Sequence, residues 1–131
     1  MSFTHTTGVT YRTNAGTLQS STDQLSADTE HNLQDSIGAN GGVTHFVFPV
    51  DVSEIQSFAI YSDQDLTINI NSDGAPDQVL NLTGSRMLTW NVNRIDSNPL
   101  TADWTGIWVH NDTASAASLK MSFLINQPSG S

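Results

Sequence analysis

The chain contains no cysteine, so it can form neither a disulfide nor a thiolate metal site. A cysteine-free chain suits a reducing compartment, or a particle that is assembled in one. The 131 residues are enough for one domain, and a domain of this size buries roughly two thirds of the surface of its unfolded chain. The sequence therefore predicts a single domain, residues 1–131, that is stable without covalent cross-links.

Basic residues are scarce. Four arginine and lysine residues stand against thirteen aspartate and glutamate residues, and the formal net charge is −9. The four cations are scattered along the sequence: Arg12, Arg86, Arg94 and Lys120. Such a surface repels the phosphate backbone of nucleic acids and the headgroups of anionic membranes. We therefore expect no nucleic-acid partner and no membrane partner.

Long hydrophobic runs are missing from the sequence as well. No window approaches the ~20 apolar residues that a membrane-spanning helix needs. Residues 1–7 have neither the basic region nor the apolar run of a secretory signal. These features predict a protein that is made in the cytoplasm.

Signatures of catalysis and metal binding are absent too. The sequence has no Gly-x-Ser-x-Gly elbow, no phosphate-binding loop and no Gly-x-Gly-x-x-Gly motif. His5, His31, His45 and His110 are far apart, and none of them has a histidine two residues away to make a ligand pair on one strand face. We expect no enzyme, no catalytic residue, no cofactor and no metal, although distant histidines or carboxylates can still meet in a folded chain.

Two segments rich in side-chain oxygen, Asp63-Gln64-Asp65 and Asn71-Ser72-Asp73, could suggest a calcium site. Neither has the glycine at the sixth position and the glutamate at the twelfth that a calcium loop requires. Asp and Asn side chains also bond their own backbone in turns, and this chemistry accounts for both segments without a metal.

What the sequence does contain is a regular alternation of apolar and polar residues. Leu66, Ile68 and Ile70 share one face of an extended chain, and the polar residues between them share the other. The same alternation recurs in other short segments: 43–52, 57–61, 79–82, 87–92, 104–111 and 119–125. Turn-forming residues separate these segments, and no helical run is long enough for a parallel crossover. The sequence predicts an all-β fold, an antiparallel β-sandwich of jelly-roll-like type with eight or nine short strands.

The two ends of the chain have different patterns. Residues 3–13 are rich in threonine and predict a strand that is interrupted at Gly8. Residues 17–28 predict a loop across the sandwich with at most one helical turn, because Ser, Thr and Asp side chains compete for backbone hydrogen bonds. Residues 127–131 predict a mobile polar tail.

A glycine cluster, residues 38–42, separates two segments with strand character, residues 30–37 and 43–52. Glycine supplies the positive φ angles that a chain reversal needs. Two strands around such a cluster predict a β-hairpin. Pro49 has no amide hydrogen, which places it on an edge strand or at the end of a strand.

Two of the tryptophans differ in their expected surroundings. Trp90 alternates in phase with apolar residues, which predicts a core position. Trp108 and His110 share the face opposite Ile107 and Val109, which predicts an exposed position or an interface. Tryptophan is enriched at protein interfaces, although an exposed ring on a sheet face can also stack on a sugar.

The candidate interface residues are Trp108, His110, Phe3 and Tyr11, of which the last two are large apolar residues of the N-terminal strand. A threonine-rich segment with strand character can add to the edge of a neighbour's sheet. We therefore expect residues 1–13 to act as a contact arm.

From Val43 onward, the order of the segments carries a resemblance. Residues 48–55 run from a strand into a short polar connection, and residues 62–68 form a tight turn followed by a central strand. The pattern continues through further segments: Ala75-Pro76-Asp77, Trp90, 104–111 and 119–125. In this order of parts, the chain resembles small β-sandwich structural proteins of tailed bacteriophages, which include capsid cement and decoration proteins.

The resemblance implies a non-enzymatic structural protein of the virion, made in the host cytoplasm and bound to the outer shell. The expected partners are the major capsid protein and further copies of the chain, with a homotrimer favoured. The alternatives are a carbohydrate-binding module on a phage tail or host-facing protein, and a hydrolase whose site the sequence does not reveal.

Overall fold

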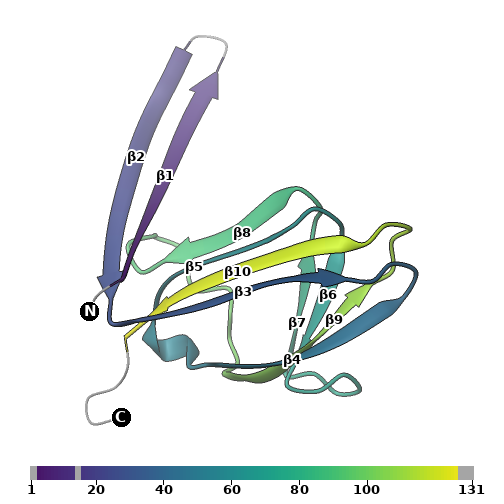
Figure 1. Ribbon diagram of the computed structural model, residues 1–131. Helices are drawn as coiled ribbons and strands as arrows, with labels where there is room; N and C mark the ends of the chain where they lie inside the picture. Colours follow the sequence, from purple (N-terminus) through teal and green to yellow (C-terminus); the bar gives the residue numbers. More distant parts are fainter. Residues whose placement is uncertain (1–2, 14–15, 127–131) are drawn as a thin grey trace.

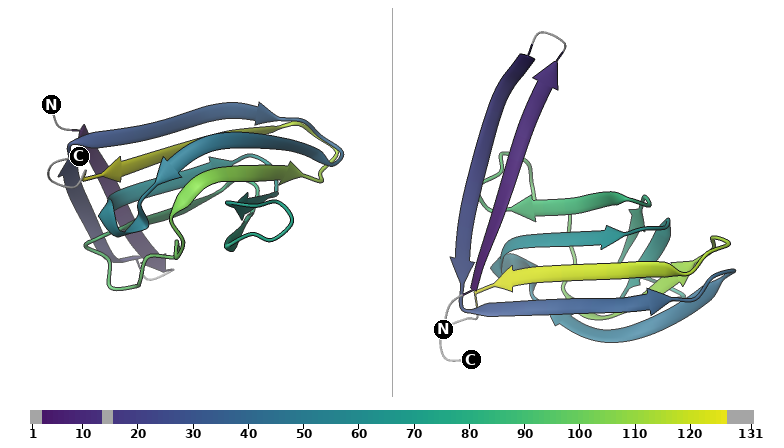
Figure 2. Two further views of the ribbon diagram at one scale, coloured as in Figure 1. Left: turned by 90° about the horizontal axis from the view of Figure 1, so that it is seen from below. Right: turned by 45° about the horizontal axis from the view of Figure 1, so that its top comes forward.

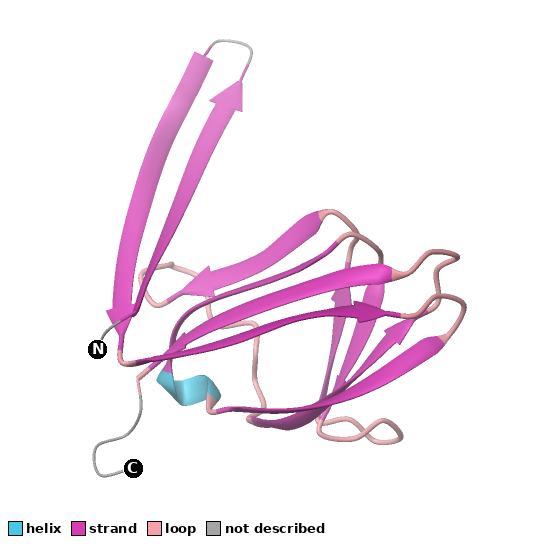
Figure 3. Ribbon diagram, viewed as in Figure 1, coloured by secondary structure: helices cyan, strands magenta, loops and turns pink. Residues whose placement is uncertain are grey.

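The computed structural model describes residues 3–13 and 16–126, and within these ranges the side chains of residues 3–8, 22 and 24–126. The chain forms a two-layer sandwich from which one long hairpin projects (Figure 1). The predicted tail, residues 127–131, lies outside the described residues. Strands make up nearly all of the regular structure, and one 3-10 turn, η1 (Val52–Glu54), is the single helical element of the described chain (Figure 3).

Eight antiparallel strands of the described chain form the sandwich. The β10 sheet has the order β3-β10-β5-β8, and the β9 sheet has the order β4-β9-β6-β7. The bounds of these strands are β3 (Thr29–Ile37), β4 (Gly42–Val50), β5 (Ile55–Ser62), β6 (Leu66–Ile70), β7 (Gln78–Leu82), β8 (Arg86–Asn91), β9 (Trp104–Asn111) and β10 (Ala117–Ile125).

The connections of the sandwich follow the jelly-roll pattern. Successive strands alternate between the two sheets, apart from β6 and β7, which are neighbours in the β9 sheet. Eight strands arranged in this way make the double-sheet jelly roll. The predicted fold class, an antiparallel jelly-roll-like β-sandwich, is therefore confirmed.

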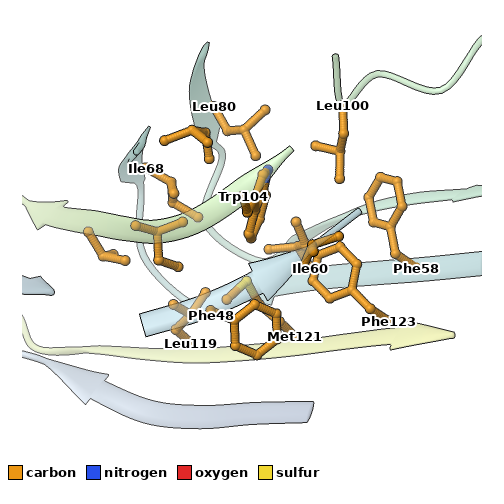
Figure 4. Close-up of a cluster of buried hydrophobic side chains, with 14 of the residues drawn as sticks. Phe48, Phe58, Ile60, Ile68, Leu80, Leu100, Trp104, Leu119, Met121 and Phe123 are labelled. Atoms are coloured by element: carbon orange, nitrogen blue, oxygen red, sulfur yellow. The ribbon is translucent and has the colours of Figure 1, made fainter. Parts of the chain in front are cut away.

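The core lies between the two sheets, and it is built from the inward residues of the alternating segments. Leu66, Ile68 and Ile70 are exposed by 2%, 0% and 0%, as the alternation predicts. At the centre, the ring centroids of Trp104 and Phe123 lie 5.2 Å apart. Figure 4 shows these rings among aliphatic side chains from both sheets. One buried cluster thus holds the two layers together.

The glycine cluster between β3 and β4 moves the chain from one sheet into the other. Asn40 and Gly41 have positive φ angles of 59° and 87°. A Cβ atom on Gly42 would lie 2.2 Å from the carbonyl oxygen of Gly38, so only glycine fits there. The Gly41 amide donates to the carbonyl oxygen of Asn111 over 2.8 Å, which ties the corner to β9.

The predicted β3–β4 hairpin is wrong. β3 pairs with β10, and β4 pairs with β9, so the two strands lie in different sheets. A glycine cluster indicates that the chain reverses, but it does not say whether the two strands then lie side by side or face to face. The prediction for Pro49 is confirmed, because β4 is an edge strand and its pairing shifts register between Val47 and Val50.

The N-terminal strands β1 (Phe3–Thr13) and β2 (Gly16–Ala27) form a two-stranded antiparallel sheet. The right-hand view of Figure 2 shows this hairpin leaving the sandwich at the end where β10 finishes and β3 begins. The predicted loop over residues 17–28 is wrong, because β2 pairs with β1 along its length. The predicted interruption at Gly8 is also wrong, since Gly8 pairs with Thr22 and the register shifts between Tyr11 and Arg12 instead.

The region of Trp90 differs in part from expectation. Strand β8 ends at Asn91, and Val92 is 42% exposed rather than buried. Trp90 itself is half-buried and packs against the edge of the core, while its indole nitrogen donates to the carbonyl oxygen of Asp96 over 2.9 Å. Its predicted core position is therefore only partly correct.

Candidate binding surfaces

The base of the hairpin is fixed to the outer face of the β10 sheet by a small apolar cluster. Leu25 and Ala27 are buried against Leu124, and half-buried Phe3 packs against the same cluster. Leu124 is 0% exposed although it lies outside the main core. The hairpin therefore covers an apolar residue that the sandwich alone would leave in water.

Polar contacts fix the same base. His5 Nδ1 lies 3.1 Å from Ser57 Oγ, and His5 Nε2 lies 3.2 Å from both Glu30 Oε2 and Ser122 Oγ. These partners come from β5, β3 and β10, so one imidazole joins the hairpin to three strands. Because the base is held by both apolar and polar contacts, the hairpin has a defined root on the sandwich.

Beyond its base, the hairpin has no strand partner in the described chain except itself. β1 pairs with β2, and neither strand pairs with the β10 sheet or the β9 sheet. In an antiparallel pair, alternate backbone N–H and C=O groups of each strand point away from the partner. The hairpin thus presents two free edges to which another strand can add.

A cleft of about 900 Å³ lies between β1 and the outer face of the β10 sheet. Its lining includes residues 4–8 and the exposed Met87 and Ile95. The Arg94 guanidinium at the rim is paired with Asp96 at 2.8 Å, so these two charges offset each other. The lining also includes His5, Ser57 and Ser122, which are the polar residues that fix the root of the hairpin.

The outer face of the β9 sheet is a second surface. The rings of His45 and Trp108, which are cross-strand partners, stack with centroids 4.0 Å apart and an angle of 12°. His110 Nε2 pairs with Asp73 Oδ1, and Asn69 Nδ2 donates to the same oxygen over 3.0 Å. The face thus combines aromatic rings with an oriented carboxylate.

Hydrogen bonds to this carboxylate affect its ionisation. The hydrogen bond with His110, and then that with Asn69, lower the pKa of Asp73 below its ordinary value. Asp73 is exposed to solvent, so desolvation raises its pKa by less than each of these hydrogen bonds lowers it. Asp73 is therefore a carboxylate at neutral pH, with its charge held beside His110 and Asn69.

The four predicted interface residues lie on two different surfaces. Trp108 and His110 share the outer face of the β9 sheet, as their spacing predicts, and both are half-buried rather than fully exposed. Phe3 packs at the root of the hairpin, where it fixes the arm. The backbone of Tyr11 belongs to the distal part of β1, and its side chain lies outside the described side chains.

Sequence reasoning missed the residues that hold the hairpin. Leu124 breaks the alternation of its strand, because Phe123, Leu124 and Ile125 are apolar in succession. Three apolar residues in succession are typical of a strand that is covered on both faces, so this run was a signal that the sequence offered. The roles of His5 and of Asn91, whose amide donates to Thr7 Oγ1 over 3.0 Å, depend on long-range contacts and had no local signal.

No family model, curated protein or solved structure matches the chain. The described part of the chain holds no group of three or more His, Cys, Asp or Glu side chains placed to bind a metal ion. Among the same residues, no helix has the length and apolar character to cross a membrane.

Proposed function

We propose that the protein is a capsid decoration protein of a tailed bacteriophage. In this role it is a non-enzymatic part of the virion that binds the major capsid protein on the outside of the shell. The observation that carries the proposal is the hairpin β1–β2, which is fixed at its root and free along both edges within the described residues. Within the predicted arm, residues 1–13, the described residues 3–13 form β1, so the proposed arm is β1 together with β2.

A free strand edge suits attachment to a shell. Strand addition joins two chains through main-chain hydrogen bonds and needs no deep pocket. A shell of repeated subunits offers the same acceptor edge many times, and three copies around a local symmetry axis would each use it equivalently. We therefore propose a homotrimer on the shell, with each hairpin extended toward a neighbouring subunit.

Composition and fold support the same role. A net charge of −9 keeps many copies soluble and away from the packaged genome, and a chain without cysteine folds in a reducing cytoplasm. Jelly rolls occur in viral capsid domains and also in lectins, so the fold adds support by analogy. The resemblance to phage structural proteins from Val43 onward points in the same direction.

The test removes the free part of the hairpin and keeps its root. Gly8 and Thr22 are cross-strand partners, so a two-residue Asn-Gly turn can replace residues 9–21 and close a shorter hairpin. We expect this variant to fold, because Leu25, Ala27 and Leu124 remain packed, and to lose co-sedimentation with undecorated capsids. Circular dichroism and urea unfolding check the fold.

Trp108→Ala is the matched control for the other surface, and we expect it to sediment with capsids as the unmodified chain does. Full-strength capsid binding by the shortened hairpin would contradict the role of the arm. Loss of binding in Trp108→Ala alone would move the contact to the β9 sheet. Quantitative mass spectrometry of virions provides a second check, since decoration requires a copy number comparable with that of the major capsid protein.

A further inference from the structure

The outer face of the β9 sheet is separate from the hairpin. The hairpin roots on Ser57, Ser122 and Leu124, which belong to the β10 sheet. The β9 sheet is the other layer of the sandwich, so its outer face points away from the proposed arm (Figure 1). Capsid attachment through the hairpin leaves this face open to a second ligand.

Trp108 is held as a platform on this face. His45 covers one side of the indole at a centroid distance of 4.0 Å. The other cross-strand partner of Trp108 is Asn69, a short side chain whose amide is engaged with Asp73. The indole therefore stands between β4 and β6, and because Trp108 is half-buried, part of the ring is open to a ligand.

Glycine keeps the stacked pair in place. A Cβ atom on Gly106 would lie 2.9 Å from His45 Nε2, so the imidazole sits over a position without a side chain. His45 is thus seated between the sheet and Trp108 without a competing side chain. A preorganised ring of this kind loses little conformational freedom when a ligand stacks on it.

Polar groups lie on the strands and the turn next to Trp108. Asp73 Oδ1 accepts from His110 and Asn69, and no hydrogen bond from any described residue reaches Asp73 Oδ2. Thr67 Oγ1 donates to Asn81 Oδ1 over 3.3 Å on the neighbouring strands. An adjacent hollow of about 460 Å³ continues the polar surface, and its lining includes Asp65, Thr67, Asn81, His110 and Asp112.

The distribution of apolar residues argues against a protein partner here. Val43 and Val47, exposed by 48% and 79%, lie on edge strand β4, and Val79, exposed by 46%, lies on edge strand β7. The apolar residues are therefore at the margins, and the polar groups with Trp108 are at the centre. Protein interfaces have the opposite arrangement, with an apolar centre and a polar rim.

We propose that this face binds an uncharged saccharide. One sugar ring packs on the exposed part of the Trp108 indole, its hydroxyls donate to Asp73 and bond with Asn69, and a neighbouring unit enters the polar hollow. A pyranose presents both an apolar C–H face and a ring of hydroxyls, which matches an aromatic plane beside a carboxylate. The carboxylates and the net charge of −9 disfavour acidic sugars.

The test uses the full chain and immobilised oligosaccharides of glucose, galactose, mannose and N-acetylglucosamine, with sialylated and uronic-acid oligosaccharides as the acidic set. We expect binding to at least one neutral glycan and none to the acidic set. Trp108→Ala should weaken that binding by about tenfold. Trp108→Phe should retain most of it, because an aromatic plane remains.

Tyr61→Ala is the matched control, since Tyr61 is a half-buried aromatic residue of the β10 sheet. Urea unfolding of each variant confirms that the sandwich is intact. Failure to bind any neutral glycan, preference for the acidic set, or equal binding by Trp108→Ala would overturn the proposal. The variant with the shortened hairpin should bind the same glycan, which separates this inference from the proposed attachment to capsids.

Discussion

The hairpin and the sandwich are built from the same kind of strand, yet they differ in what covers them. In the sandwich, each strand buries one face against the opposite sheet, and residues such as Ile68 and Val109 are fully buried. In the hairpin, the described buried residues, Leu25 and Ala27, lie close to the root. Among the side chains that the structure describes, the sandwich therefore buries residues along its strands, whereas the hairpin buries them where it meets the β10 sheet.

The largest effect is expected in the sandwich, where Ile68→Asp places an unpaired charge between the sheets. The cost should exceed about 4 kcal/mol, a large part of the stability of a small domain. Thr67→Asp is the control on the outer face of the same strand and should cost less than about 1 kcal/mol. Urea unfolding measures both, and similar midpoints would show that the strand faces are assigned incorrectly.

An intermediate and local effect is expected at the root of the hairpin. Leu25→Ala removes packing against Leu124 and should weaken docking of the hairpin by about 2 kcal/mol. Hydrogen exchange in β1 and β2 should become faster while the global unfolding midpoint stays nearly constant. Leu82→Ala, at a similarly buried site in the main core, should instead lower the global midpoint. Equal global destabilisation by both variants would mean that the hairpin and the sandwich unfold together.

The smallest effect concerns the carboxylate on the outer face of the β9 sheet. His110→Ala should raise the pKa of Asp73 more than Asn69→Ala does, because the hydrogen bond with His110 is the larger cause of the lowered pKa. Titration of the Asp73 side chain by NMR measures this. The opposite order, or no change in either variant, would contradict the assigned network.

The same hydrogen-bond network determines whether the stability of the protein rises or falls as the pH changes. A carboxyl group with a lowered pKa in the folded state binds fewer protons there than in the unfolded chain. The contribution of Asp73 to stability is therefore complete above the ordinary aspartate pKa and is lost as the pH falls through the lowered value. Any stability advantage over Asp73→Asn should disappear as the pH falls through that window.

The sandwich strands could be predicted because their alternation is a local property. Residues 104–111 were assigned as a strand with Ile107 and Val109 inside, and strand and faces agree with the structure. β2 could not be predicted in the same way, because its Ser- and Thr-rich sequence has no clear apolar face. The partners of β3 and β4 also lie far along the chain, which local turn chemistry does not encode.

The candidate surfaces, like the strands, could be predicted from the sequence only in part. The shared face of Trp108 and His110 follows from a spacing of two residues, so the sequence reveals it. Contacts of Trp108 with His45 and of His110 with Asp73 join different elements, and no spacing rule relates them. The sequence therefore indicated which residues could be exposed, but not which partners would orient them.

The pairing of β3 with β10 has a consequence for how the protein is made. These are the first and last strands of the sandwich, and Thr29 pairs with Ile125. On the ribosome, β1 and β2 can meet early because they are adjacent in sequence, whereas β3 has no partner until β10 has emerged from the exit tunnel. Non-local pairing of this kind slows folding, and an unpaired β3 is open to wrong partners in the meantime. Synthesis at high copy number would therefore place the greatest demand on chaperones just before the last strand is released.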